Sequence, residues 1–199
     1  MPARRGRPPS FDRAEVLDKL LFLFWEKGYE ATSQSDMIDR AGISSSSLYN
    51  TFGNKPDVFD ACLTRYNEMS HGLLAPLRDG SGGLDDVGAF LEGVVAHIES
   101  REAPPGCLMV RTMTELGGRS NGSSTDERTC TYRDQITEAL RVALGRAAAK
   151  GEIDPDEVES KAFLVLSVYL GALAVAVSSP EAGAAMLASG REMVAGWNA

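Results

Sequence analysis

A tight turn followed by a short, hydroxyl-rich helix constrains this chain more than any other feature. The turn contains Gly42, and four consecutive serines follow at residues 44–47. Glycine adopts a positive φ without steric cost, so Gly42 can end one helix and reverse the chain. Ser44 can then cap the next helix, and Leu48 and Phe52, four residues apart, give that helix an inward stripe. Two short helices about a glycine turn predict a helix-turn-helix, whose second helix fits the major groove of DNA.

The residues on either side of this segment can cap two neighbouring helices. Thr32 or Ser33 can cap a helix that runs to about Ala41. Asn54 can cap another helix, and Pro56 is tolerated in its first turn. This context argues against the simplest alternative, in which the four serines form a solvated loop.

Three side chains beside the serines suit contacts to phosphates or bases. Lys55 lies at a helix start, where the peptide dipoles disfavour a cation unless an anion such as a phosphate also binds. The alternative is a surface lysine whose side chain points away from the helix end. Tyr49 either donates to a phosphate or packs on the first helix with its hydroxyl in water. Asn50 either pairs with an adenine edge or contacts a phosphate. The candidate DNA contacts in this region are Thr32, Ser33, Ser44, Ser45, Ser46, Ser47, Tyr49, Asn50 and Lys55.

The charge distribution is compatible with double-stranded DNA as a partner. The net charge is -8, but residues 1–66 hold nine basic and nine acidic residues, whereas residues 67–199 hold eleven and nineteen. Arg4, Arg5 and Arg7 form an arm that can reach a minor groove or bind phosphates, unless it is simply a disordered basic tail. No apolar run follows these arginines, so we expect no secretory leader and a cytoplasmic location.

The segment over roughly residues 12 to 66 resembles the TetR/AcrR family of regulators. The residues that carry the likeness are Gly28-Tyr29, Ala31-Thr32, Ala41-Gly42-Ile43-Ser44, Leu48-Tyr49, Phe52 and Lys55. The resemblance implies a transcriptional repressor that acts as a homodimer and leaves its operator when a small-molecule effector binds.

The pattern along the whole chain predicts an all-α protein. We expect an N-terminal three-helix helix-turn-helix domain, joined by a long helix to a helical ligand-binding and dimerisation domain. The proposed limits are a basic arm at 1–11, the DNA-binding domain at 12–54 and the effector-binding and dimerisation domain at 55–199. Helices are expected over 12–27, from Lys55 to about Leu74, and, between Gly- and Pro-containing breaks, over 84–101, 107–116, 126–149, 155–178 and 181–197.

The most apolar segment, residues 162–177, is expected to be a buried helix, because it is shorter than a membrane span requires. We therefore expect no membrane partner. Its small residues let another helix approach closely, and the last helix has a matching face. These two helices from each subunit would form a four-helix interface, unless they pack only within their own subunit. The candidate interface residues are Leu166, Leu170, Gly171, Ala174, Met186, Met193 and Trp197.

The resemblance also implies a pocket for the effector in the second domain. Its candidate walls are Phe90, Val94, His97, Cys107, Val110, Met113, Thr114, Tyr132, Ile136, Phe163 and Tyr169. Most of these residue types at helical spacing also form ordinary core, and His97 can be a structural histidine. The effector's identity does not follow from the sequence.

Two rival functions also remain open at this stage. Cys107 follows Pro-Pro-Gly at an expected helix start, where the helix dipole would lower the thiol pKa, so a thiol-redox-responsive regulator is one alternative. A helical protein-interaction module that does not bind DNA is the other. Cys62, Cys107 and Cys130 lack metal-ligand spacing, so we expect no metal and no cofactor. No phosphate-binding loop, GxSxG or HExxH motif occurs, so we expect no enzyme and assign no catalytic residue.

Overall fold

The computed structural model describes residues 11–117 and 124–198, which contain helices and no strand. The first part of the chain forms α1 (Arg13–Lys27), α2 (Gln34–Ala41), α3 (Ser45–Phe52), α4 (Lys55–Ser70), the 3-10 turn η1 (His71–Leu74) and α5 (Ala75–Asp79). The second part forms α6 (Leu84–Ser100), α7 (Leu108–Leu116), α8 (Ser124–Ala149), η2 (Pro155–Glu157), α9 (Val158–Ala176), α10 (Pro180–Ala195) and η3 (Gly196–Asn198). The predicted all-α class is therefore confirmed.

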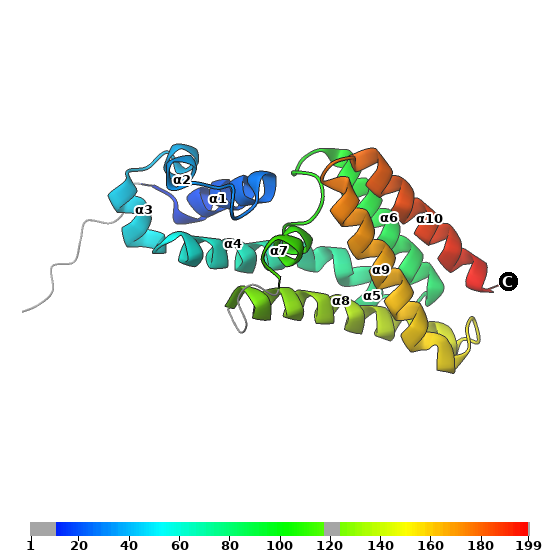
Figure 1. Ribbon diagram of the computed structural model, residues 1–199. Helices are drawn as coiled ribbons and strands as arrows, with labels where there is room; N and C mark the ends of the chain where they lie inside the picture. The colour runs from blue at the N-terminus through cyan, green and yellow to red at the C-terminus, as the bar shows by residue number, and fades with distance from the viewer. Residues whose placement is uncertain (1–10, 118–123, 199) are drawn as a thin grey trace, which may run out of the picture.

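The helices form two groups joined by α4 (Figure 1). Helices α1, α2 and α3 gather at one end, and α4 leads from them toward the rest of the molecule. Helix α8 contacts α4, while α6, α9 and α10 pack together at the other end. Helix α7 lies between the groups and contacts both α1 and α8. A helix-turn-helix domain thus precedes a helical C-terminal domain.

Local hydrogen bonds set the boundaries of the three short helices. Ser33 caps α2 by accepting from the Asp36 amide at 3.1 Å, and the Asp36 carboxylate accepts from the Ser33 amide in return. The hydrogen bond from Lys27, together with those from Ser33, holds the pKa of Asp36 well below its usual range. Gly42 ends α2 with φ 67°, the left-handed conformation that glycine accommodates best. Ser44 caps α3, as predicted from the sequence.

The long helix after the helix-turn-helix is shorter than predicted. It begins with Asn54 as its cap, but its α-helical part ends at Ser70 rather than at about Leu74. The chain then tightens into η1, and the Ala75 amide bonds to the Gly72 oxygen in the 3-10 pattern. Pro76 follows and has no amide hydrogen to continue an α-helical bond to Gly72. The separate helix α5 therefore follows from the proline, although it was not predicted.

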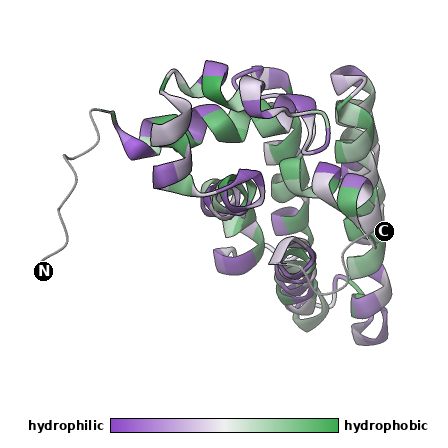
Figure 2. Ribbon diagram, turned by 60° about the vertical axis from the view of Figure 1, so that its left-hand side comes forward, coloured by the Kyte–Doolittle hydropathy of each residue, from purple (hydrophilic) through white to green (hydrophobic). Residues whose placement is uncertain are grey.

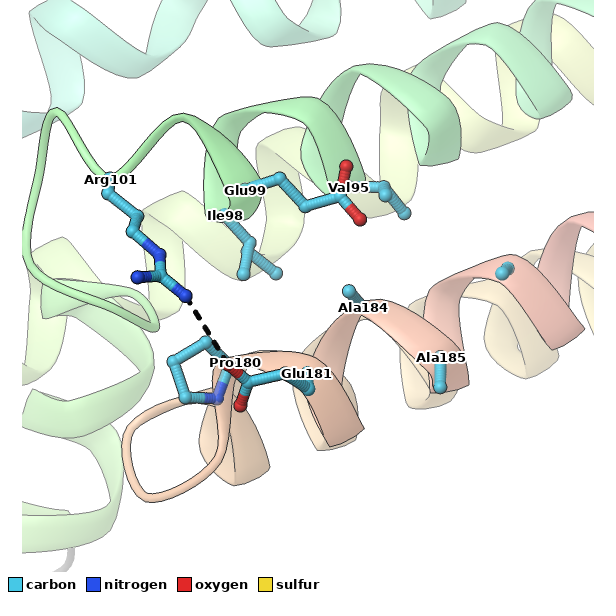
Figure 3. Close-up of a pocket in the computed structure, with 9 residues that line it drawn as sticks. Val95, Ile98, Glu99, Arg101, Pro180, Glu181, Ala184 and Ala185 are labelled. Atoms are coloured by element: carbon cyan, nitrogen blue, oxygen red, sulfur yellow. Dashed lines mark ion pairs between the residues drawn. The ribbon is translucent and has the colours of Figure 1, made fainter.

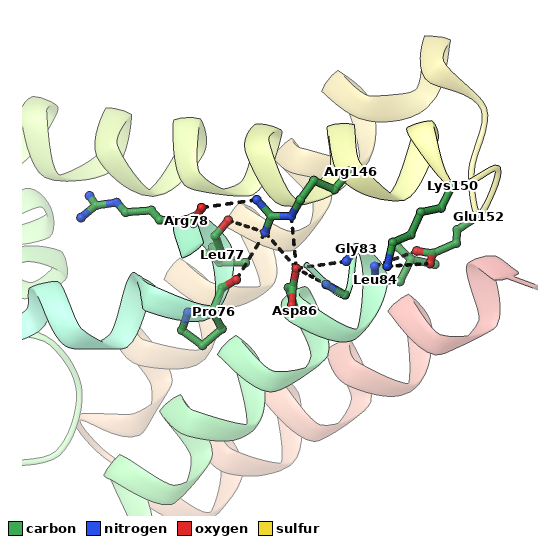
Figure 4. Close-up of polar contacts among 10 residues, drawn as sticks. Pro76, Leu77, Arg78, Gly83, Leu84, Asp86, Arg146, Lys150 and Glu152 are labelled. Carbon is green, nitrogen blue, oxygen red and sulfur yellow. Dashed lines mark hydrogen bonds and ion pairs between the residues drawn. The ribbon is translucent and has the colours of Figure 1, made fainter. Parts of the chain in front are cut away.

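Arg146 of α8 joins three elements at the end of the molecule away from α3 (Figure 4). Its guanidinium donates to the Leu77 oxygen in α5 and to the Asp86 carboxylate, both at 2.8 Å. Asp86 also accepts from the amides of Gly82 and Gly83. Burial of Asp86 opposes its ionisation, but these hydrogen bonds outweigh burial and lower its pKa. The network fixes α5, the start of α6 and α8 relative to one another.

The apolar helix near the C-terminus belongs to the folded bundle. By length and composition, the stretch Pro155–Ala176 passes the test for a membrane-spanning helix. It instead packs against α8 and α10, and its buried residues line one side of α9. Figure 2, coloured by hydropathy, shows green, apolar segments on the helices near the C-terminus. The sequence-based interpretation of a buried helix fits this packing, although the argument from insufficient length does not hold for the whole helix.

Candidate nucleic-acid interface and its connection to the bundle

Most of the polar side chains of α3 and its cap are exposed to solvent. Residues 44–46 and Asn50 are exposed, and Ser47 is half-buried. Leu48 and Phe52 point inward and are buried in the hydrophobic core, where α3 contacts α2 and α4. The hydroxyls of Ser44 and Ser47 are 2.9 Å apart, so the first turn of the helix is internally ordered. The arrangement leaves a small, polar, rigid surface that can approach another molecule closely.

Lys55 is held at the first residue of α4 by an aromatic ring. Its Nζ lies 4.4 Å from the centre of the Tyr29 ring, which is a cation–π contact. The Tyr29 ring itself packs on Phe59, with ring centres 4.7 Å apart. The lysine therefore does not point away into solvent. Lys55 is the first residue of α4, and the start of a helix favours an anion.

Tyr49 occupies neither of the positions considered from the sequence. Its hydroxyl is buried and has no hydrogen-bond partner among the described residues, so it reaches neither water nor an outward phosphate. A buried hydroxyl without a partner costs about 1 to 3 kcal/mol. A phosphate contact by Tyr49 would require its side chain to turn outward.

Thr32 was wrongly predicted as a DNA contact. It is fully buried, and its hydroxyl donates to the Gly28 oxygen at 2.6 Å. It therefore stabilises the turn between α1 and α2. Ser33 remains exposed as the cap of α2. The predicted contacts Arg4, Arg5 and Arg7 lie outside the described residues.

A clamp from α7 holds the end of α1, and sequence reasoning missed it. Arg111 donates to the backbone oxygens of residues 25–27 at distances of 3.3, 3.1 and 2.8 Å. The carboxylate of Glu115, one turn later, accepts from the amides of residues 29–30 at 3.0 and 2.7 Å. Gly28 lies between them with φ 84°, and a Cβ there would meet Glu115 Oε2 at 2.7 Å. An Arg–Glu pair four residues apart was a visible signal, but its partners are distant in sequence.

Most of the predicted effector walls form a filled core. The buried ones are Phe90, Val94, Cys107, Val110, Tyr132, Ile136 and Tyr169. The hydroxyls of Tyr132 and Tyr169 are 2.8 Å apart, and the Cys107 sulfur lies 3.4 Å from the Tyr132 hydroxyl. Phe90 packs on Tyr169 with ring centres 5.3 Å apart. The polar groups of these side chains contact one another, and their rings pack closely, so little space for a ligand is left among them.

The cavity beside this core is very small. It measures about 10 Å³ and is lined in part by Tyr132, Ile136 and Tyr169. A space of this size is about the minimum that holds one water molecule. A ligand larger than water can enter there only if the surrounding side chains move.

Two predicted wall residues were wrongly placed. Thr114 is exposed, and its hydroxyl donates to the Arg111 oxygen within α7. Phe163 is 48% exposed, because the buried positions of α9 fall on the other side of the helix. His97 and Met113 are half-buried. The His97 ring stacks on Trp25 of α1, with ring centres 6.2 Å apart, as expected of a structural histidine.

The environment of Cys107 argues against the redox alternative. The residue lies directly before α7, as expected, but it is buried, and burial raises the pKa of its thiol. Hydrogen bonds from Tyr132 and Tyr66 act in the opposite direction without reversing the shift. Because the thiolate is the reactive form, this environment does not favour oxidation.

A thiol titration should separate the three cysteines. Cys62 and Cys107 are buried, and Cys130 is exposed. We expect 5,5′-dithiobis(2-nitrobenzoate) to modify Cys130 rapidly in the native protein and Cys62 and Cys107 only after denaturation. In Cys130→Ser the rapid phase should disappear. Rapid modification of Cys107 in the native protein would restore the redox alternative.

The predicted dimer-interface residues differ in their exposure. Ala174 and Met186 are exposed, and Leu170, Gly171, Met193 and Trp197 are half-buried. Leu166 is only 7% exposed and packs inside its own subunit, so its assignment to the interface was wrong. The exposed apolar residues Phe163, Leu164 and Val175 on α9 were not assigned to the interface. The sequence-based assignment therefore misidentified which side of α9 faces outward.

Comparisons with known proteins assign the chain to a family. A signature described as bacterial regulatory proteins, tetR family, matches residues 16–62. A second, described as a tetracyclin repressor-like C-terminal domain, matches residues 83–186, more than half of the chain. The chain belongs to the TetR family. The resemblance inferred from the helix-turn-helix residues is confirmed.

Individual family members support the same assignment. The chain is 34% identical over 157 residues to the HTH-type transcriptional repressor ComR of Escherichia coli (strain K12), covering 76% of this chain and 72% of that protein. It is 28% identical to the uncharacterized HTH-type regulator YezE of Bacillus subtilis (strain 168), covering 79% and 80%. A cysteine-substituted form of the TetR-family regulator CifR, complexed with operator DNA, matches with a TM-score of 0.81 and 28% identity over 96% of this chain and all of that one. The predicted class, a DNA-binding transcriptional regulator, is confirmed.

Proposed function

We propose that this protein is a cytoplasmic, homodimeric repressor that binds a palindromic operator and leaves it when a small-molecule effector binds. The observation that carries this proposal is the outward polar surface of α3 beside Lys55 at the start of α4. A short helix of this kind reads base edges, while a cation and amides at a helix start bind the adjacent phosphate. We assign the arm, DNA-binding domain and effector domain to 1–11, 12–54 and 55–199.

The exposed face of α9 and α10 supports the dimer. Phe163, Leu164, Val175 and Met186 are exposed there, although large apolar side chains are usually covered. Gly171 is only half-buried and leaves room for close approach by a second helix. Packing α9 and α10 against the same helices of a second copy would form a four-helix interface and present two copies of α3 to the two halves of an operator.

Helix α7 offers a physical connection between effector and DNA. Its start contacts the buried tyrosine core through Cys107, and its Arg111 and Glu115 hold the end of α1. A shift of α7 would therefore move α1 and with it the reading helix. The regulator AibR was crystallised with isovaleryl coenzyme A and operator DNA. AibR shares this fold at 16% identity and a TM-score of 0.70, over 90% of this chain and 96% of that one. A coupling free energy of about 1 to 3 kcal/mol is sufficient for regulation.

Two substitutions should distinguish phosphate contacts from base contacts. Lys55→Ala removes a charge beside the α4 amides, so we expect weaker binding to operator and random duplex by similar factors, with a salt-dependence slope reduced by about 1. Asn50→Ala should cost about 1 to 3 kcal/mol at one base position and leave random-duplex binding unchanged. Fluorescence anisotropy at several salt concentrations measures both.

Lys150→Ala is the matched control, because it removes the same charge at an exposed position after α8. It should leave operator affinity within about twofold of the parent, given the screening of distant charges. Equal losses for Lys55→Ala and Lys150→Ala would contradict the phosphate site. Equal losses on operator and random duplex for Asn50→Ala would contradict its role in reading bases.

A further inference from the structure

Arg13, the first residue of α1, carries a charge that no carboxylate neutralises. The residue is exposed, and its guanidinium forms no ion pair and donates no hydrogen bond among the described residues. Its contact is with an aromatic ring, because the guanidinium carbon lies 5.4 Å from the centre of the Phe52 ring. All of its N–H donors are therefore available to a partner from outside.

Most lysines and arginines in the described part of the chain lie beside a carboxylate. Arg40 of α2 is 2.6 Å from Glu26. Even Arg101, whose side chain is 82% exposed, lies 3.6 Å from Glu181 (Figure 3). The described cations without such a partner are Arg13, Lys55, Arg78 and Arg111.

Two of these four cations lie beside the reading helix. Arg111 already donates to backbone oxygens at the end of α1, and Arg78 belongs to α5, at the end of the molecule away from α3 (Figure 4). Arg13 and Lys55 remain, and each rests on an aromatic ring. A cation–π contact holds a cation in place without neutralising its charge.

The contact with Phe52 fixes where the charge of Arg13 lies. Phe52 is the last residue of α3, and Lys55 begins α4 three residues later. The start of α1, α3 and the start of α4 lie at the same end of the molecule (Figure 1). Asn50, two residues before Phe52, is exposed. When α3 enters a major groove, the phosphates along that groove are therefore the nearest anions to both cations.

The start of α1 is an unfavourable place for an arginine that serves only the fold. Peptide dipoles place partial positive charge at a helix start, which disfavours a cation there. Asp12, the cap of α1, accepts from the Ala14 amide at 2.8 Å and forms no ion pair with Arg13. A phosphate from a partner would offset this cost, and the guanidinium group suits phosphate oxygens particularly well.

We propose that Arg13 binds a phosphate of the DNA backbone beside the groove that α3 enters. Phe52 supports the guanidinium, and the N–H groups donate to phosphate oxygens. The contact carries no base information, but it fixes the orientation of α3 in the groove. This assignment rests on the operator binding proposed above and adds a contact to it.

The test compares Arg13→Lys, which keeps the charge, with Arg13→Met, which keeps an unbranched side chain over Phe52 without the charge. Binding to a random-sequence duplex is measured by fluorescence anisotropy between about 50 and 200 mM salt. We expect Arg13→Met to bind about tenfold or more weakly at the lowest salt and to reduce the salt-dependence slope by about 1 for each bound subunit. Arg13→Lys should keep the slope and stay within about threefold of the parent.

Arg78→Met is the matched control, because it removes another guanidinium without an acidic partner, far from α3 (Figure 4). It should stay within about twofold of the parent, since distant charges are screened. Thermal unfolding tests for a merely structural role. Arg13→Met should unfold at the parent's temperature or slightly above it, because it removes a cation from a helix start.

An unchanged slope in Arg13→Met, an equal loss of slope in Arg13→Lys, or equal losses in Arg13→Met and Arg78→Met would overturn the proposal. So would a lowered unfolding temperature that accounts for the lost binding. A parent protein that binds no duplex contradicts the repressor function and this contact together. A parent that binds duplex, with an Arg13→Met variant that keeps its slope, contradicts only the contact.

Discussion

Replacing Phe163 with glutamate is expected to give a folded monomer that binds operator at least about a hundredfold more weakly than the parent protein. Phe163 is 48% exposed on α9, so its loss removes little from the core of its own subunit. In the proposed symmetric dimer, two carboxylates would be forced into an apolar interface, and burying an unpaired charge is strongly unfavourable. A monomer presents one copy of α3 and loses the second half-site. Sedimentation velocity and fluorescence anisotropy on the same samples measure both effects.

Met69→Glu is the matched control for this substitution. Met69 is likewise 48% exposed, but it lies on α4 rather than on the proposed interface. It should remain dimeric and bind operator within about threefold of the parent, because an exposed substitution away from the interface changes little. A dimeric Phe163→Glu that keeps full operator affinity would refute the assignment of the interface to α9 and α10.

Arg146→Leu should lower the free energy of unfolding by up to about 3 kcal/mol, the lower end of the range for breaking a buried ion pair, because this pair is partly exposed. The side chains of Arg146 and Asp86 are 24% and 12% exposed, so water cannot replace the lost contacts well. The substitution also removes the guanidinium donor from the Leu77 oxygen of α5. Thermal and urea unfolding, followed by circular dichroism, measure the loss.

The loss should depend on pH, because the folded protein lowers the pKa of Asp86. Ionised Asp86 therefore stabilises the parent above its unfolded pKa of about 4, and this contribution disappears as the pH falls through the lower folded value. The difference between parent and Arg146→Leu should be largest near neutral pH and should narrow below about pH 4.

Arg141→Leu is the control for Arg146→Leu, because it breaks an equally short ion pair at the surface. Arg141 and Glu159 lie 2.6 Å apart with side chains 39% and 53% exposed, so the expected loss is below about 1 kcal/mol. Equal losses in the two variants, or a gap that widens in acid, would contradict the structural role assigned to Arg146.

The parts of the fold that depend on neighbouring residues could be predicted from the sequence. Ser33, Ser44 and Asn54 cap helices, and Gly42 ends one, through hydrogen bonds to residues at most four positions away. Such signals are complete within a short stretch of sequence. The length of the long helix was overestimated. It was predicted to run to about Leu74 but ends at Ser70, because its end depends on the 3-10 turn at residues 71–74 and on Pro76 after it.

The errors in the candidate sites share a physical cause. Arg111 and Cys107 owe their environments to partners that the fold brings from distant parts of the chain. Thr32 bonds to Gly28, four residues away, but its full burial depends on how the helices pack. Helix α9 is apolar around most of its circumference, so hydrophobic periodicity does not show which side faces the core. Phe163 was accordingly predicted to line the interior but is exposed. Leu166 was predicted to lie at the interface but is buried.

The most direct test of the central claim is selection of bound duplexes from a random DNA pool, followed by sedimentation of the complex. A dimeric repressor that reads DNA with α3 should enrich an inverted repeat, with half-site centres about 34 to 36 Å apart or at a multiple of that spacing. The complex should contain two chains per duplex. Enrichment of no sequence, or a complex with a single chain on an asymmetric site, would contradict the account.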